Sequence, residues 1–141
     1  KCGSKSKQVK DTRHFSSAEF ICPDCKSESM SQDFITDLEQ ARRIANISFK
    51  ITSGYRCQAY QDDLRKRGYE TAKNGPSPHF LGVAADISTV GDDKRHTIIK
   101  SLLTIFNRIG IGSNFIQVDA ADRYVAGEFM RNSNRIWHYR R

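Results

Sequence analysis

One stretch decides how this 141-residue chain is organised: Ser77-Pro78-His79-Phe80-Leu81-Gly82-Val83-Ala84-Ala85-Asp86-Ile87. Gly82 predicts a turn, and the run of small and apolar residues after it predicts a short, tightly packed strand. His79 then lies on the turn that enters the strand, and Asp86 lies near the far end of the strand. Zinc accepts both an imidazole nitrogen and a carboxylate oxygen, at about 2.0–2.2 Å. The stretch therefore predicts two metal ligands, with two hydrogen-bonded surface groups as the alternative.

Further segments flank this stretch in a fixed order. Upstream stands Ile51-Thr52-Ser53-Gly54-Tyr55-Arg56-Cys57, and downstream stand Phe115-Ile116-Gln117-Val118-Asp119 and Ile136-Trp137-His138-Tyr139. In this order and at these separations, the set resembles the M15 zinc peptidases. The closest likeness is to the small D-Ala-D-Ala carboxypeptidase-like branch found in phages, small single-stranded DNA viruses and bacteria. The resemblance runs from about residue 14 to residue 139.

The resemblance implies roles for particular residues. It implies that His79 and Asp86 bind Zn²⁺, and that Arg56 holds a substrate carboxylate or stabilises an oxyanion, because guanidinium pairs bidentately with carboxylate. An ordinary salt bridge is the alternative for Arg56. Tyr55 and Ser77 are expected beside the substrate, with Ser77 also able to orient a metal ligand.

The implied activity is that of a metallopeptidase that hydrolyses amide bonds in peptidoglycan stem peptides. Asp119 is the candidate general base, because it lies two residues beyond Gln117 on the same face of a strand. A structural carboxylate is the alternative. The implied place of action is the bacterial cell wall or periplasm, with a virus-encoded protein made in the host cytoplasm as one route there.

The third metal ligand is where the chain departs from the family. Its members usually carry His-x-Asp where this chain has Gln117-Val118-Asp119, and a glutamine oxygen is a neutral, weak ligand for zinc. His138 could complete the site from a neighbouring strand. Alternatively Gln117 and water bind the ion weakly, or the site is inactive and the chain is a cell-wall-binding module on the same fold.

The cysteines form a second candidate site. Cys22 and Cys25 make a C-x-x-C pair, and Cys57 follows Arg56 directly. A second C-x-x-C would favour structural zinc, but the sequence has none. A three-thiolate metal site, joined or not by Cys2 or a histidine, a disulfide and unbonded thiols therefore all remain open for Cys22, Cys25 and Cys57.

Periodicity and turn signals predict an α+β fold. The expected structure is a small, mostly antiparallel sheet with helices packed on one side, and the resemblance implies the hedgehog and D-Ala-D-Ala peptidase architecture. A helical turn capped by Ser16 or Ser17 opens the ordered part. The expected helices are 31–45, 58–67 and 92–108, the last ended by Gly110 and Gly112, and the expected strands are 49–53, 83–87, 115–119 and 135–139.

Composition limits the partners. The chain carries a formal charge of +7 and 38% hydrophobic residues, which suits one soluble domain. The positive charge favours polyanions such as wall polymers, with an ordinary solvated surface as the alternative. We expect a flexible basic segment at 1–13 and a single domain at 14–141. No apolar run reaches the ~20 residues that span a bilayer. No nucleic-acid-recognition motif is present, so nucleic acid is not an expected partner, and a monomer is expected.

Overall fold

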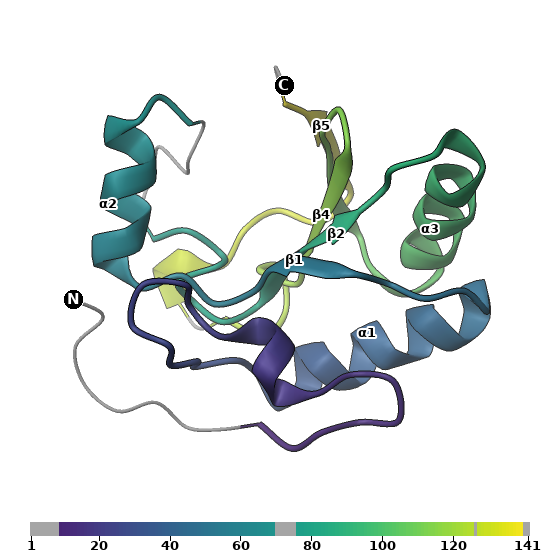
Figure 1. Cartoon of the computed structure of the whole chain (residues 1–141), viewed down its shortest axis with the longest axis horizontal. Helices are drawn as coiled ribbons and strands as arrows, with labels where there is room; N and C mark the ends of the chain where they lie inside the picture. The colour runs from purple at the N-terminus through teal and green to yellow at the C-terminus, as the bar shows by residue number, and fades with distance from the viewer. Residues whose placement is uncertain (1–8, 70–75, 126, 140–141) are drawn as a thin grey trace.

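A mixed sheet forms the centre of the computed structural model, which describes residues 9–69, 76–125 and 127–139 (Figure 1). Within these ranges the sheet has five strands in the order β1-β2-β4-β3-β5. All neighbouring strands are antiparallel except β3 and β5, which are parallel. The predicted α+β class with a mostly antiparallel sheet is therefore confirmed. The strands are β1 Ile51–Ser53, β2 Ala84–Ser88, β3 Arg108–Ile111, β4 Phe115–Asp119 and β5 Arg135–His138.

The helices begin and end at residues with clear local signals. Helix α1 covers Gln32–Ala45; the Ser31 side chain accepts a hydrogen bond from the backbone N–H of Phe34, which satisfies a donor that the first turn leaves open. It ends at Asn46, in the left-handed conformation that commonly stops helices. The predicted capped turn is the 3₁₀ helix η1, Ser17–Phe20, with Ser16 as its cap. The others are α2 Gln58–Lys66, α3 Asp92–Ile105 and the 3₁₀ helix η2 Gly127–Phe129.

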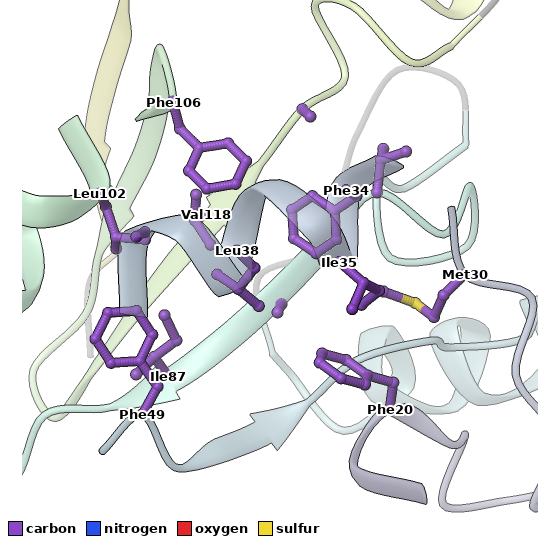
Figure 2. Packing of buried hydrophobic residues seen from close by; sticks show 14 of the residues in the cluster. Phe20, Met30, Phe34, Ile35, Leu38, Phe49, Ile87, Leu102, Phe106 and Val118 are labelled. Carbon is purple, nitrogen blue, oxygen red and sulfur yellow. The ribbon is translucent and has the colours of Figure 1, made fainter. Parts of the chain in front are cut away.

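The hydrophobic core lies between the sheet and the paired helices α1 and α3. Figure 2 shows Phe34 and Leu38 of α1 packed near Leu102 of α3 and near Phe106, the residue that follows this helix. From the sheet, Val118 points into the same layer, as do the other apolar residues on this face of the strands. Each fully buried side chain of this size contributes roughly 1.5–3 kcal/mol, so this layer is the main source of stability. The sheet residues that share it are Ala85, Ile87, Ile109, Ile116 and Val118.

The third helix packs differently from the other two. In Figure 1, α2 stands apart from α1 and α3, across the opposite face of the sheet. Only Gln61 and Leu64 of α2 are buried, so the helix has little apolar surface with which to join the core. It forms the wall of a polar cleft instead. Within the described residues, no helix combines the length and apolar character needed to cross a membrane.

The predicted helix 92–108 was wrong at its C-terminal end. The helix stops at Ile105, and the following residues form β3, a strand that the sequence interpretation missed. Gly110 was taken as a helix terminator, but it lies in β3 beneath Trp137, where an added Cβ would stand 2.5 Å from the indole nitrogen. Glycine is needed there because the indole ring lies directly against the strand.

Part of the N-terminal segment expected to be flexible is attached to the core. The backbone N–H of Val9 donates to Glu28 (2.8 Å), and the Thr12 hydroxyl donates to Glu39 (2.7 Å). Residues 1–8 of that expected segment lie outside the described residues. The ordered structure therefore begins before residue 14.

Candidate metal-binding cleft

A cleft of about 850 Å³ lies between α2 and the polar face of the sheet. The strand register places its central side chains. Asp86 of β2 pairs directly with Gln117 of β4, and Ala84 pairs with Asp119. Residues in register on neighbouring strands share a face, so Asp86, Gln117 and Asp119 all lie on the cleft side. The apolar residues between them point into the core.

A tight turn before β2 brings His79 to the floor of the cleft. The backbone N–H of His79 donates to the Ser77 hydroxyl (3.2 Å), and that of Gly82 donates to the His79 carbonyl (3.3 Å). Gly82 has φ +77°, and a Cβ at this position would lie 1.9 Å from the carbonyl oxygen of Ser29. Only glycine satisfies both the left-handed conformation and this close approach. Ser77 thus lines the cleft and also fixes the backbone that carries His79.

The imidazole of His79 faces Asp86 in an unusual arrangement. Its Nδ1 lies 2.7 Å from the Gly54 carbonyl, which can only accept, so Nδ1 carries a proton, and in the neutral ring Nε2 presents a lone pair. Nε2 lies 3.3 Å from Oδ1 of Asp86, and within the described residues both atoms are buried without a hydrogen-bond partner. When the ring is neutral, these two acceptors repel unless a metal ion lies between them; a protonated ring forms an ion pair with Asp86 instead.

The separation of these two atoms fits a shared metal ion. Ligands at about 2.1 Å from a tetrahedral zinc stand about 3.4 Å apart, because the edge of a tetrahedron is about 1.63 times its radius. The observed 3.3 Å matches this spacing. Donation of the other ring N–H to a backbone carbonyl is also the usual arrangement of a metal-binding histidine.

Arg56 holds the other oxygen of the Asp86 carboxylate. Its Nη2 donates to Oδ2 (2.9 Å), while its Nε donates to the Ser53 hydroxyl (2.9 Å). Burial raises the pKa of Asp86, but the nearby His79 and Arg56 outweigh this effect and hold the pKa below its ordinary value. The carboxylate is therefore ionised, with Oδ1 directed at His79. These contacts use two of the five N–H donors of Arg56, which also lines the cleft.

Gln117 is held by two neighbours. The Tyr139 hydroxyl donates to Oε1 (2.5 Å), and Nε2 donates to Oδ2 of Asp119 (3.4 Å). Burial is the main reason that the pKa of Tyr139 is raised to about 12, so the phenol remains a donor at neutral pH. The amide oxygen that would replace the usual histidine ligand is therefore already engaged.

Asp119 forms a buried ion pair. Nε of Arg108 donates to its Oδ1 (2.6 Å), as does the backbone N–H of Ala121 (3.1 Å). The residue lines the cleft but is fully buried, and Arg108 is itself held against Trp137, with 5.2 Å between guanidinium and ring. The candidate base thus lies at the site with hydrogen bonds to both oxygens: Oδ1 accepts from Arg108 and a backbone amide, and Oδ2 accepts from the Gln117 amide.

Two predicted site residues are not brought to the cleft. His138 pairs with Ile111 in register and is exposed on the face of β5 opposite Trp137, so it does not approach His79 or Asp86. Tyr55 is 7% exposed and stacks on Phe80, with 6.4 Å between ring centroids, as part of the core. Alternation along β5 was sufficient to exclude His138, since Trp137 and Tyr139 occupy the cleft face.

Gln61 is a cleft residue that the sequence interpretation missed. It lies on α2, is only 3% exposed, and its Oε1 has no hydrogen-bond partner. A buried, unsatisfied amide oxygen on a cleft wall is a candidate contact for a bound molecule. Its only sequence signal is a polar residue on a polar helix, which is too common to be informative.

The cysteines gather away from this floor. The sulfur atoms of Cys22, Cys25 and Cys57 all lie within 4.8 Å of one another, so the three residues could hold a metal ion. In this structure Cys25 and Cys57 are disulfide-bonded. Sγ of Cys22 lies 3.7 Å from Sγ of Cys57. The prediction that these three residues come together is confirmed.

The fold and the site define an α+β chain with a polar cleft whose floor holds an imidazole and a carboxylate suited to one cation. Comparison with known proteins assigns no family: no protein-family model matches the chain, and no curated protein matches it either. What the chain can do follows from the chemistry of the cleft and from the motifs that form it.

Proposed function

We propose that this chain is a metallopeptidase of the M15 type that acts on peptidoglycan stem peptides at the bacterial cell wall, with a zinc site weakened by Gln117. The observation that carries the proposal is the facing pair of buried acceptors, Nε2 of His79 and Oδ1 of Asp86, 3.3 Å apart. A resident cation explains why neither atom has a hydrogen-bond partner. The Ser-Gly-Tyr-Arg and His-x-x-Gly-x-Ala-x-Asp motifs supply the same two ligands and Arg56.

The fit to zinc is partial. His79 and Asp86 have the donor types, tautomer and separation that zinc requires. The third position does not fit as well, since the Gln117 amide is a poor ligand and Tyr139 already donates to it. We therefore expect weak binding, with water in the remaining positions.

The charge of the cleft favours an anionic substrate. Among the described residues, arginines outnumber carboxylates along its lining, and the whole chain carries +7. A peptide with a free carboxylate would meet the remaining donors of Arg56, and a buried amide oxygen on α2 would accept from its backbone N–H groups. The lining arginines are Arg56, Arg67, Arg108 and Arg131, and the lining carboxylates are Asp86 and Asp119.

The chain's own residues have separable tasks in amide hydrolysis. When bound, zinc supplies a Lewis acid that activates water and polarises the scissile carbonyl. Arg56 keeps Asp86 ionised and directed at His79, and it is placed to stabilise negative charge on the substrate. Arg108 holds Oδ1 of Asp119, while Oδ2 accepts from the Gln117 amide at 3.4 Å, so Oδ2 is the oxygen placed to accept a proton and Arg108 is a positioning residue for base chemistry there.

Zinc affinity and cleavage of purified wall peptides test the proposal. We expect the parent to bind zinc weakly in non-reducing buffer, His79→Ala to lose that binding, and Gln117→His to bind at least about tenfold more tightly. His138→Ala is the matched control, because it removes an imidazole from the opposite face of the sheet, and it should behave as the parent. Mass spectrometry of wall peptides incubated with zinc-loaded Gln117→His should reveal a cleaved amide bond, and intact peptides would refute the peptidase proposal.

One observation favours a second candidate, a wall-binding module without catalysis. Tyr139 occupies the oxygen of Gln117, and Arg108 occupies Asp119, so the two groups expected to complete catalysis are both engaged. On this alternative, the cationic cleft binds wall peptides without metal. Co-sedimentation with purified cell-wall sacculi should then be unchanged by a chelator, whereas loss of sedimentation on chelation would favour the metallopeptidase.

A further inference from the structure

The three clustered cysteines come from two segments that are far apart in the sequence. Cys22 and Cys25 lie on the loop after η1, and Cys57 is the N-cap residue of α2. Cys22 and Cys57 are fully buried, and Cys25 is partly buried. The cluster lies outside the cleft lining, so it is separate from His79 and Asp86.

The loop that carries Cys22 and Cys25 is built as a tight turn. The backbone N–H of Lys26 donates to the Cys22 carbonyl (2.9 Å), and that of Cys22 donates to the Ser27 carbonyl (2.7 Å). Lys26 has φ +61°, an uncommon conformation for a residue other than glycine, asparagine or aspartate. This turn directs both thiols of a C-x₂-C pair toward one point, the spacing found in structural zinc sites.

One pair of sulfurs already has the spacing of a thiolate metal centre, and the disulfide pair, about 2.05 Å apart, reaches it once the bond is reduced. Thiolates at about 2.3 Å from a tetrahedral zinc stand about 3.8 Å apart. The Sγ atoms of Cys22 and Cys57 are 3.7 Å apart, and the third sulfur is within 4.8 Å of both. A disulfide uses only Cys25 and Cys57, whereas a metal ion uses all three.

We propose that the reduced protein binds one Zn²⁺ through the thiolates of Cys22, Cys25 and Cys57, and that the disulfide is the oxidised, metal-free form of this site. An external dithiol supplies the two electrons: it is oxidised to a cyclic disulfide while the Cys25–Cys57 bond breaks to give two thiols. The three thiols then lose three protons to bind the ion, which leaves the centre with one net negative charge. Soft thiolate ligands select zinc over magnesium or calcium.

The site would fasten the segment that carries Arg56. Cys57 follows Arg56 directly, and the backbone N–H of Tyr55 donates to the Phe20 carbonyl (2.9 Å), so the loop and this segment already lie side by side. A metal ion bound by all three cysteines would link the loop that carries Cys22 and Cys25 to the segment that carries Arg56 and Cys57. The ion thus acts as a structural link, and it does not depend on the proposed peptidase activity.

Cobalt titration of the full chain tests the site. After reduction with a dithiol and its removal without oxygen, the parent should bind one Co²⁺ with thiolate-to-cobalt charge-transfer absorption, which only cysteine ligands give. A pH indicator should report protons released as the ion binds, because cysteine binds a metal as the thiolate. The disulfide form should give no such absorption.

Matched variants locate the ligands. Cys22→Ser, Cys25→Ser and Cys57→Ser should each lose about a third of the absorption or fail to bind, because each removes one of the three thiolates. Cys2→Ser carries the same substitution outside the described residues and should keep the parent spectrum, as should His79→Ala. Full absorption in Cys22→Ser, or equal loss in Cys2→Ser, would overturn the proposal. Loss of zinc from the cleft alone would instead affect only the peptidase proposal.

Discussion

Tyr139 controls what Gln117 can do in the cleft. At the scale of single residues, the amide oxygen of Gln117 shares its lone pairs between a phenol donor and any metal ion at His79 and Asp86. The same side chain is therefore a hydrogen-bond bridge between Tyr139 and Asp119, and under the proposed function it would be a weak ligand once the site is loaded. Residue identity alone does not reveal this competition, because it depends on which neighbour reaches the oxygen.

Tyr139→Phe should strengthen zinc binding. A typical hydrogen bond contributes about 0.5–1.5 kcal/mol, and its removal frees the oxygen of Gln117, so we expect zinc affinity to rise by up to about tenfold. A competition assay with a chelating dye measures the change. Tyr124→Phe is the control, since Tyr124 donates to Asp37 (2.7 Å) outside the cleft. Weaker binding in Tyr139→Phe would mean that the phenol positions Gln117 as a ligand.

Gly82→Ala should disrupt the turn that carries His79, and Gly68→Ala provides the comparison. Both glycines have positive φ, +77° and +90°, but a Cβ has nothing within 4 Å at Gly68 and meets the Ser29 carbonyl at 1.9 Å at Gly82. Gly68→Ala should lower the free energy of unfolding by about 1–2 kcal/mol, the conformational term alone. Gly82→Ala should lower it considerably more and also lose zinc binding. Equal losses in urea unfolding would show that the contact with Ser29 relaxes easily.

At the scale of secondary-structure elements, Glu39 of α1 attaches the N-terminal segment. Its carboxylate accepts from the Thr12 hydroxyl (2.7 Å), from the backbone N–H of His14 (2.8 Å) and from Nε of Arg43 (3.2 Å). Its other close partner is Nδ1 of His14, at 2.5 Å. Burial raises the pKa of Glu39, but the bonds from His14 and Thr12 outweigh it and lower the pKa to about 2.

Acid should therefore loosen this attachment. Because the folded pKa lies below the ordinary value of 4.5, the stabilisation is complete above about pH 4.5 and is lost as the pH falls toward 2. The linked change in the free energy of unfolding is roughly 2–3 kcal/mol. Urea unfolding at several pH values measures it. Glu39→Gln should flatten the dependence in this window, while the exposed control Glu128→Gln should retain it. An unchanged slope in Glu39→Gln would contradict the assignment.

At the scale of the whole molecule, local signals predicted the segments whose apolar residues follow only the helical spacing or only the alternation of a strand. The helix expected at 31–45 is α1, capped by Ser31, and alternation placed Gln117 and Asp119 on one face. The predicted C-terminal end of α3 was wrong because Ile109 continues the helical spacing of apolar residues. What makes residues 108–111 a strand is the pairing with β4 and β5, a non-local interaction that periodicity does not carry.

The candidate site was predictable to a similar extent. His79, Asp86 and Arg56 were named from the motifs that carry the resemblance, and they lie together in the cleft, on or beside the short strands β1 and β2. The partners that decide their chemistry did not follow: Arg108 opposite Asp119 and Tyr139 beside Gln117 depend on the strand order. That Gln61 lines the cleft depends on where α2 lies relative to the sheet.

The position of α2 across the cleft predicts uneven local stability. Helix α1 buries five residues, whereas α2 buries only Gln61 and Leu64 and has no side-chain cap at Cys57. Helical segments with few buried apolar contacts open with smaller free energies than the core. Amide hydrogen exchange under native conditions should therefore be faster across α2 than across α1. The opening free energy of α2 should be smaller than the free energy of global unfolding.

The Leu64→Ala variant makes this test specific. Leu64 is the only buried apolar side chain of α2, so its removal should speed exchange in α2 while leaving α1 protected. Leu38→Ala, in the middle of α1, should instead lower the protection of the whole molecule, because it removes a fully buried side chain from the shared core. If Leu64→Ala lowers protection throughout the chain, α2 is part of the same cooperative unit as the core. The cleft would then be a rigid feature of the fold, with both walls opening only on global unfolding.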